Sequence, residues 1–167
     1  MFKEIKTREI QDNPFQLIGG DWLLVTSERE GKVNTMTASW GGLGVMWGKD
    51  VAYVVLRPQR YTKELLDATG LLSLSVLPEG NKDLYGYLGK ASGRQEDKIE
   101  KAGLTVAHDG AVPYFEEARL ILLCKPLFAQ KYDPACFLEP SLDEKWYPDK
   151  DYHTLYVCEI QKVLVKE

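Results

Sequence analysis

Residues that form disulfides or bind metal are scarce in this chain of 167 residues. Its three cysteines, Cys124, Cys136 and Cys158, are an odd number without a CxxC spacing, and each lies in or near an apolar stretch. This pattern disfavours disulfide scaffolds and zinc ribbons. The two histidines, His108 and His153, lie far apart, and no carboxylates accompany them at ligand spacing. We therefore predict no metal site, and any chemistry is expected to use an organic cofactor or none.

Long charged runs and long apolar runs are also missing. Lysine and arginine number 21 against 25 aspartates and glutamates, and no basic run could follow a phosphate backbone, so nucleic acid is not an expected partner. The longest apolar run, Val51–Leu56, is far too short to cross a bilayer. The N-terminus lacks an apolar stretch with a small-residue cleavage site. We expect a cytoplasmic protein that has no membrane partner.

The composition that remains is that of an ordinary globular protein. Hydrophobic residues make up 44% and charged residues 28% of the chain. The length corresponds to one domain, and no internal repeat, low-complexity tract or linker interrupts it. We therefore interpret residues 1–167 as a single domain.

Apolar stretches of strand length, separated by turn residues, dominate the chain. The expected strands are Trp22–Glu28, Val33–Ser39, Asp50–Arg57, Leu71–Leu77, Arg119–Ala129 and His153–Val165. Helix formers and capping residues predict short helices over Tyr61–Thr69, Asn81–Ala91 and Glu96–Ala102. Because strands and helices do not alternate regularly, the pattern favours an antiparallel barrel over a doubly wound sheet. The glycines give no GxGxxG after a strand and no Gly-Lys-Ser/Thr triplet, which disfavours Rossmann and P-loop sites.

Hydroxyl side chains gather in the segment Asn34–Trp40. The period of a strand places Thr35, Thr37 and Ser39 on one face, opposite an apolar face. Such a row is equally typical of the solvated edge of a half-buried sheet. The residues that follow favour a ligand, because glycine lets a backbone approach closely and tryptophan offers a flat face to a conjugated ring. These residues are Gly41, Gly42 and Gly44, with Trp40 and Trp47.

Two further segments combine small donors with charge directly before a helix. In Arg57–Thr62 the Thr62 hydroxyl and the first free amides of the helix can donate to an anion, with Arg60 nearby. The alternative is that Thr62 is only a helix cap and that the arginines are solvated. The segment Ser92–Lys98 has the same character and, taken alone, is typical of a capped turn.

These segments, taken in order, resemble the flavin reductase-like family. The similar segments are Asn34–Gly42, Arg57–Leu65, Leu72–Leu77, Ser92–Ile99, Ala102–Thr105, Ala118–Cys124 and Asp151–Ile160. The resemblance rests on this ordered set, which covers roughly residues 20–163, rather than on any single motif. It implies a mainly β fold, an antiparallel split β-barrel with a few short flanking helices, that binds FMN at a homodimer interface.

The resemblance also implies a place for individual residues around FMN. Those implied to line the isoalloxazine, through backbone amides as much as side chains, are Thr37, Ala38, Ser39 and Trp40. Those implied at the ribityl and phosphate end are Arg57, Arg60, Tyr61 and Thr62, with Ser92, Gly93 and Arg94 closing the phosphate side. His153 is implied to approach the ring or the nicotinamide as a hydrogen-bond donor and is the candidate catalytic residue. The alternative for His153 is a structural histidine at the start of a strand.

The activity implied is that of an FMN-dependent NAD(P)H oxidoreductase, which passes hydride from NADH or NADPH to FMN and on to a small-molecule or protein acceptor. A second hypothesis is a flavoredoxin-like electron carrier that does not use a nicotinamide. It is favoured by Ala129–Tyr132, which stands where the family often has a basic stretch. A third is a flavin-binding module without turnover. The segment 133–149, rich in proline and aromatic residues, is hypothesised to cover the flavin and select what reaches it.

Overall fold

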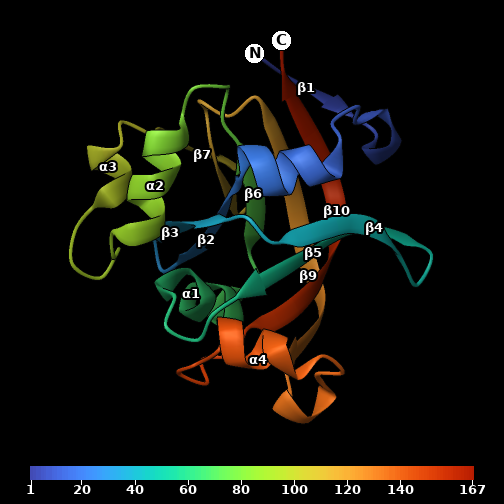
Figure 1. Ribbon diagram of the computed structural model, residues 1–167. Coiled ribbons are helices and arrows are strands. Elements are labelled where there is room, and N and C mark those ends of the chain that lie inside the picture. Colours follow the sequence, from blue (N-terminus) through green and yellow to red (C-terminus); the bar gives the residue numbers. More distant parts are fainter.

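The computed structural model describes residues 1–167 and consists mainly of antiparallel strands with short flanking helices (Figure 1). The strands are β1 (Phe2–Ile5), β2 (Leu23–Arg29), β3 (Lys32–Ala38), β4 (Gly41–Met46), β5 (Lys49–Leu56), β6 (Leu72–Val76), β7 (Val106–Asp109), β8 (Val112–Phe115), β9 (Leu120–Lys131) and β10 (Thr154–Lys166). The α-helices are α1 (Tyr61–Thr69), α2 (Lys82–Lys90), α3 (Lys98–Lys101) and α4 (Pro140–Trp146). Shorter helical turns cover Thr7–Glu9, Gln16–Asp21 and Pro134–Cys136. No helix is both long and apolar enough to cross a lipid bilayer.

Most of the predicted elements are present near their expected bounds. The helix Tyr61–Thr69 is confirmed residue for residue, and the two long strands near the C-terminus are β9 and β10. The predicted helix Glu96–Ala102 is shorter, because Asp97 caps it and the helix runs only over Lys98–Lys101. Strand β4 was missed, since its glycines give no alternation of side chains to detect.

The main sheet is antiparallel throughout and has the order β3-β2-β6-β9-β10-β5-β4, with β1 paired to the end of β10. Strands β3 and β4 therefore form its two opposite edges. Yet Ser39 and Trp40 alone join these two strands along the chain. A sheet whose edges are joined by two residues has to roll until the edges meet. The result is the split barrel expected from the sequence. Its two edge strands, β3 and β4, do not pair, and the gap between them, here called the seam, is bridged by Ser39 and Trp40.

The inside of the rolled sheet holds the larger hydrophobic cluster. Alternate residues of the strands point into it, as in the set Val25, Leu74, Leu122 and Tyr156, and Leu66 of α1 joins them. A second cluster lies outside the barrel, where Leu24 of β2 and Phe115 of β8 pack against α2 and α3. Figure 1 shows α2 and α3 side by side on this flank, whereas α1 and α4 lie together at one end of the molecule.

The second cluster gives a test of this packing. Phe115 is fully buried in it, and Phe15 is 87% exposed. We predict that Phe115→Ala lowers the free energy of unfolding by about 3–5 kcal/mol, because a cavity replaces the ring. Phe15→Ala should change it by less than about 0.5 kcal/mol. Urea unfolding of the two variants checks this, and equal losses would contradict the packing described.

Candidate functional site

The connection between β3 and β4 carries unused backbone hydrogen-bonding groups. Ser39 and Trp40 lie outside both strands, and their backbone N–H and C=O groups make no hydrogen bond within the chain. Backbone polar groups that stay unpaired at the edge of a core are available to a ligand. The seam therefore presents a short row of free donors and acceptors.

A hollow of about 160 Å³ opens beside this connection. It brings together seven of the predicted site residues, namely Thr37, Ala38, Ser39, Trp40, Arg57, Arg60 and His153. Three lining residues were not predicted, namely Met36, Val55 and Trp146. The hollow thus combines flat or apolar walls with two guanidinium groups and one imidazole.

His153 faces the hollow as a neutral donor. Burial, with the nearby positive charge of Arg57 as a second cause, lowers the pKa of His153 to about 4. The Tyr147 hydroxyl lies 2.8 Å from Nδ1 and has no other partner, and we assign it as the donor of this hydrogen bond. The proton of the neutral ring is then on Nε2, which has no hydrogen-bond partner in the chain. With this assignment, the Nε2–H donor of His153 is free to reach a ligand.

Arg60 supplies positive charge without an acidic partner. Its Nη1 donates to the carbonyl of Gly89 at 2.6 Å, and burial together with Arg57 lowers its pKa. Lys98, which is buried, donates to the carbonyls of Leu88 and Ala91 at 2.7 and 2.9 Å, and burial lowers its pKa to about 8. Neither Arg60 nor Lys98 forms an ion pair. A half-buried and a buried cation that form no ion pair favour the approach of an anion.

Arg57, in contrast, is occupied by the chain that follows α4. Its Nη1 lies 2.7 Å from Oδ1 of Asp151, and its Nη2 donates to the carbonyl of Trp146 at 3.0 Å. The guanidinium carbon also lies 5.0 Å from the centre of the Tyr147 ring. Arg57 lines the hollow, but its donors serve this segment.

Trp146 is one of the three lining residues that sequence reasoning missed. Its ring meets Trp40 edge-on, with centroids 4.9 Å apart and planes at 88°. The signal in the sequence was coarse, because the aromatic segment 133–149 was singled out without naming which ring would reach the site. The hypothesis that this segment covers the predicted flavin region agrees with the position of Trp146.

Five other predicted residues lie outside the hollow. Thr62 is fully buried and accepts a hydrogen bond from Nδ2 of Asn34 at 2.9 Å. The Tyr61 ring lies between the cations of Lys32 and Arg94, at 5.1 and 4.8 Å. The other three are Ser92, Gly93 and Arg94. Their assignment to the phosphate end of a flavin stays a prediction.

Arg94 belongs to a different depression of the surface. It pairs with Glu64 at 2.9 Å and donates to the carbonyl of Gln59 at 3.2 Å. Together with Gly93 it lines a polar cleft of about 690 Å³ beside α3. The charges of this cleft are of both signs, since Glu28 and Asp97 also line it.

The hydroxyl row of β3 has a more structural role than the sequence suggested. Thr35 is buried and donates to the carbonyl of Val25 at 3.1 Å. Thr37 donates to the carbonyl of Tyr85 at 2.6 Å and so ties β3 to α2. Of the three hydroxyls, only that of Ser39 makes no hydrogen bond within the chain.

The glycines and Trp47 also differ from expectation. A side chain at Gly41 would collide with the carbonyl of Tyr53, and one at Gly44 would crowd the Tyr53 ring at 3.2 Å. These glycines therefore admit the neighbouring strand β5, whereas the sequence analysis expected a ligand there. Trp47 lies at the turn between β4 and β5 and packs against Phe128, with centroids 6.0 Å apart. It does not line the hollow.

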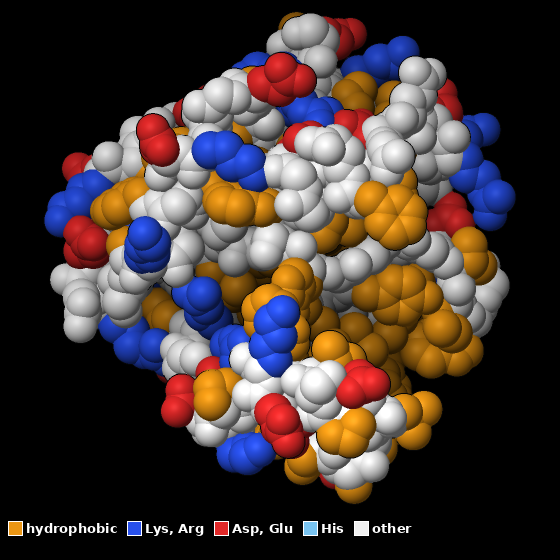
Figure 2. All heavy atoms as spheres, viewed as in Figure 1, with side chains coloured by type: hydrophobic (Ala, Val, Ile, Leu, Met, Phe, Trp, Pro, Cys, Tyr) orange, Lys and Arg blue, Asp and Glu red, His pale blue; other side chains and the backbone are white.

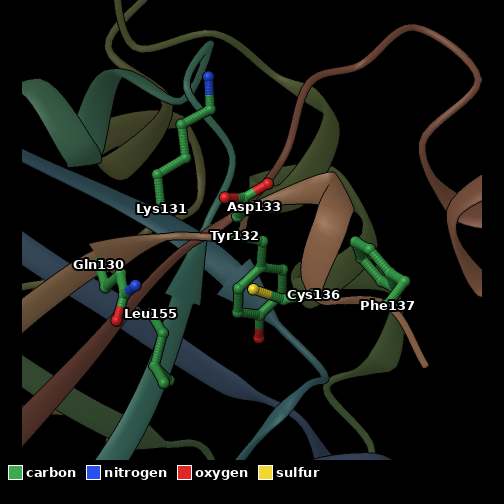
Figure 3. A pocket seen from close by; sticks show the side chains of 7 residues that line it. All are labelled: Gln130, Lys131, Tyr132, Asp133, Cys136, Phe137 and Leu155. Atoms are coloured by element: carbon green, nitrogen blue, oxygen red, sulfur yellow. The ribbon is translucent and has the colours of Figure 1, made fainter.

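A second cavity, of about 350 Å³, lies on the same face of the sheet (Figure 3). Val55 pairs with Leu155 and Leu155 with Gln130, so these three side chains share one face. Val55 lines the hollow, and the other two line the cavity. Figure 3 shows the Cys136 thiol in front of the Tyr132 ring, and the Lys131 side chain extending away from the cavity. The cavity is mostly apolar, and the side chain of its one cationic lining residue, Lys131, extends away from it.

Residues 17–167 match the family model described as the flavin reductase like domain. The chain belongs to this family. The resemblance seen in the sequence is thereby confirmed, and it extends over nearly the whole chain. The solved structures that resemble this one include two proteins described as FMN-binding.

Solved structures support the split-barrel fold. An FMN-binding domain of flavin reductase-like enzymes from Shewanella baltica has a TM-score of 0.71 at 18% identity, with 99% of this chain and 77% of that chain covered. An FMN-binding protein from Thermus thermophilus with bound p-hydroxybenzaldehyde has a TM-score of 0.69 at 25% identity, with 99% of this chain and 82% of that chain covered. Flavoredoxin of Desulfovibrio vulgaris has a TM-score of 0.68 at 25% identity, with 87% of this chain and 69% of that chain covered.

One curated relative is similar over part of the chain. It is an uncharacterized protein from Aeropyrum pernix, 31% identical over 85 residues. The matched region is 50% of this chain and 32% of that protein. The two chains therefore share a segment, and that protein extends well beyond it.

The contact between Gly93 and Asn34 gives a testable prediction. A Cβ at position 93 would overlap the side-chain amide of Asn34, which is buried and bonded to Thr62. We expect Gly93→Ala to lower the free energy of unfolding by about 1–3 kcal/mol. Gly86, inside α2, has nothing within 4 Å of an added Cβ. Gly86→Ala should raise the free energy by up to about 1 kcal/mol, and thermal unfolding compares the two signs.

The low pKa of His153 predicts a dependence of stability on pH. Its pKa is about 4 in the folded protein and 6.5 without the fold, so between these values only the unfolded chain takes up the proton. Stability should therefore fall as the pH drops from about 6.5 to 4, by up to about 3 kcal/mol.

The matched histidine variants isolate this contribution. Denaturant unfolding at several pH values should show a shallower fall for His153→Gln than for the wild type. The variant His108→Gln, which changes the exposed histidine paired with Glu28, should keep the steep fall. Equal slopes for His153→Gln and the wild type would contradict a buried neutral imidazole.

Proposed function

We propose that this protein is an FMN-dependent oxidoreductase of flavin reductase type, which takes hydride from NADH or NADPH and delivers electrons to an acceptor. The observation that carries the proposal is the seam of the barrel. There, free backbone groups of Ser39 and Trp40 lie beside the neutral donor of His153 and the unpaired cation of Arg60. The bound flavin would supply the hydride chemistry, and the chain would bind and orient it.

The ring end of the flavin fits the seam. Trp40 and Val55 give flat, apolar walls, and the amides of Ser39 and Trp40 can donate to the polar edge of the ring. Donors fixed where negative charge grows on a reduced ring favour its reduction without reorganisation. His153 would add Nε2–H as a further fixed donor, so its role is to hold a hydrogen bond rather than to transfer a proton.

The phosphate end fits Arg60. This guanidinium is half-buried, lacks a carboxylate, and is held in place by the carbonyl of Gly89. Lys98 is a second, buried cation close enough for the charge of Arg60 to lower its pKa, although it lines the neighbouring polar cleft rather than the hollow. A phosphate dianion would lower the cost of burying both charges.

We also propose that the working unit is a homodimer. The hollow is about 160 Å³, and sites for ligands of this class usually enclose about 300–1,000 Å³, so one chain offers only part of the walls. Figure 2 shows hydrophobic side chains gathered between the β4–β5 hairpin and α4. Trp47 and Phe128, in contact with each other, are 59% and 43% exposed. Size-exclusion chromatography with light scattering tests this, and a monomer at all concentrations would contradict it.

A second candidate function is that of an electron carrier. Trp146 stands against Trp40 at the hollow, where a nicotinamide would have to enter. Flavoredoxin of Desulfovibrio vulgaris is also among the structures that resemble this chain. In this alternative a protein donor reduces the bound FMN, and NAD(P)H reduces it slowly.

Absorbance spectroscopy distinguishes these functions. The protein is reconstituted with FMN and mixed anaerobically with NADH or NADPH in separate cuvettes. Bleaching within seconds supports the reductase and names the donor. A yellow protein that bleaches only with a reduced ferredoxin-like donor supports the carrier, and a protein that takes up no FMN contradicts both. A planar carbonyl compound, of the kind bound by the Thermus thermophilus protein, is one acceptor to include.

The phosphate assignment predicts a selective loss of affinity. Arg60→Gln should weaken FMN binding by about 10- to 100-fold, because a charge-assisted hydrogen bond to the phosphate is lost. Riboflavin, which lacks the phosphate, should bind both proteins equally. Arg29→Gln makes the same change of charge at an exposed site and should leave the FMN dissociation constant unchanged. Fluorescence titration measures all three, and an equal loss for riboflavin would contradict the assignment.

A further inference from the structure

The contacts of Arg57 connect the end of β5 to the segment behind α4. Nη1 holds the carboxylate of Asp151, Nη2 holds the carbonyl of Trp146, and the guanidinium plane lies near the Tyr147 ring. Two fixed donors and a ring contact leave this guanidinium little freedom to turn toward a ligand. Arg57 thus links the end of β5 to Trp146 and Asp151, and this set of contacts is called the Arg57 clasp.

The carboxylate of Asp151 is held from two sides. Gln59 donates to Oδ2 at 2.9 Å, and Arg57 donates to Oδ1 at 2.7 Å. The hydrogen bond from Gln59 and the charge of Arg57 lower the pKa of Asp151, so the ion pair persists at neutral and mildly acidic pH. Asp151 itself does not line the hollow. Asp151 therefore fixes the position of the segment behind α4 and does not itself reach a ligand in the hollow.

Trp146 is the side chain that the clasp places at the hollow. It is the last residue of α4, and its carbonyl is the one that Arg57 binds. Its ring stands edge-on to Trp40 and remains 41% exposed, which marks it as part of a rim rather than of a core. Trp146 lines a hollow of only about 160 Å³, so a second flat ring stacked there would compete with its side chain for space.

We propose that Trp146 is a specificity-determining residue that restricts a second planar ring from stacking at this site, and that Arg57 is the positioning residue that holds it there. The inference rests on the FMN site that both candidate functions share, and a rim that slows reduction by a nicotinamide favours the electron carrier over the reductase. A nicotinamide has to displace Trp146 to reach that ring. A small inorganic reductant does not need to stack and is admitted with Trp146 in place.

The first experiment changes the rim ring. Trp146→Ala and the wild type are loaded with FMN, and stopped-flow absorbance gives the rates of reduction by NADH, by NADPH and by dithionite. We expect the ratio of nicotinamide rate to dithionite rate to rise about three- to tenfold in Trp146→Ala, the range set by one aromatic edge contact. Trp146→Phe, which keeps a flat ring, should restore most of the low ratio.

A matched control lies one turn earlier in the same helix. Leu142 is 45% exposed, similar to Trp146, and does not line the hollow. Leu142→Ala should leave the ratio at the wild-type value. A rise of the same size in Leu142→Ala would mean that loosening α4 in general is responsible, which would overturn the role of Trp146.

The second experiment separates positioning from ligand binding at Arg57. If Arg57 positions the rim, Arg57→Lys and Asp151→Asn should raise the rate ratio alike, and the FMN dissociation constant of Asp151→Asn should stay that of the wild type. If Arg57 instead binds the flavin phosphate, Arg57→Lys should weaken FMN binding and Asp151→Asn should change neither quantity.

The outcomes distinguish this inference from the proposed function. A protein that takes up no FMN contradicts the proposed function and this inference with it. A protein that binds FMN but shows an unchanged or lower ratio in Trp146→Ala overturns the inference and leaves FMN binding standing. A raised ratio in Trp146→Ala, Arg57→Lys and Asp151→Asn, with Leu142→Ala unchanged, supports it.

Discussion

The two-residue connection between β3 and β4 is the constraint on which the rest of the structure depends. These strands are opposite edges of the main sheet, and Ser39 and Trp40 are too short a link for the sheet to stay open. The sheet therefore rolls, and its inward side chains form the core. The same link cannot join either ladder, so its backbone groups remain free at the seam. One constraint thus gives both the barrel and the place where a ligand can bind.

The two arginines near the seam differ in whether an acidic residue neutralises them. Arg57 is neutralised by Asp151 and serves the chain, whereas Arg60 has no acidic partner and stays available to an anion. Burial above all keeps His153 neutral by lowering its pKa, and the positive charges of Arg57 and Arg60 add to this effect. A neutral imidazole that is fixed by Tyr147 is a stable donor and a poor acid at neutral pH. The arrangement therefore suits a fixed hydrogen-bond donor rather than a group that exchanges protons.

The sequence predicted the elements whose side chains carry a clear period or cap. Helix α1 and strands β9 and β10 are examples, because their apolar residues recur regularly. Strand β4 escaped prediction because glycines give no side-chain pattern, and their close neighbour, Tyr53, lies on another strand. Whether a glycine admits a ligand or a neighbouring strand depends on pairing that a single sequence does not contain.

The site was predictable in part for the same reason. Local segments pointed to the residues of the hollow, from Thr37 to Trp40 and at Arg60, and the family resemblance added His153. The roles of Arg57 and Trp146 depend on contacts across roughly ninety residues of sequence, and local patterns do not reveal contacts of that range. Thr62 was predicted as a ligand-binding residue because of its hydroxyl, but it is buried and hydrogen-bonded to Asn34, which gives it a structural role.

The central claim is that the flavin ring lies at the seam, and a crystal structure of the protein grown with FMN tests it most directly. The account predicts the ring against Ser39 and Trp40, within hydrogen-bond distance of Nε2 of His153, and the phosphate at Arg60. A ring in the cavity between Tyr132 and Phe137, or a phosphate at Arg94 and away from Arg60, would contradict it.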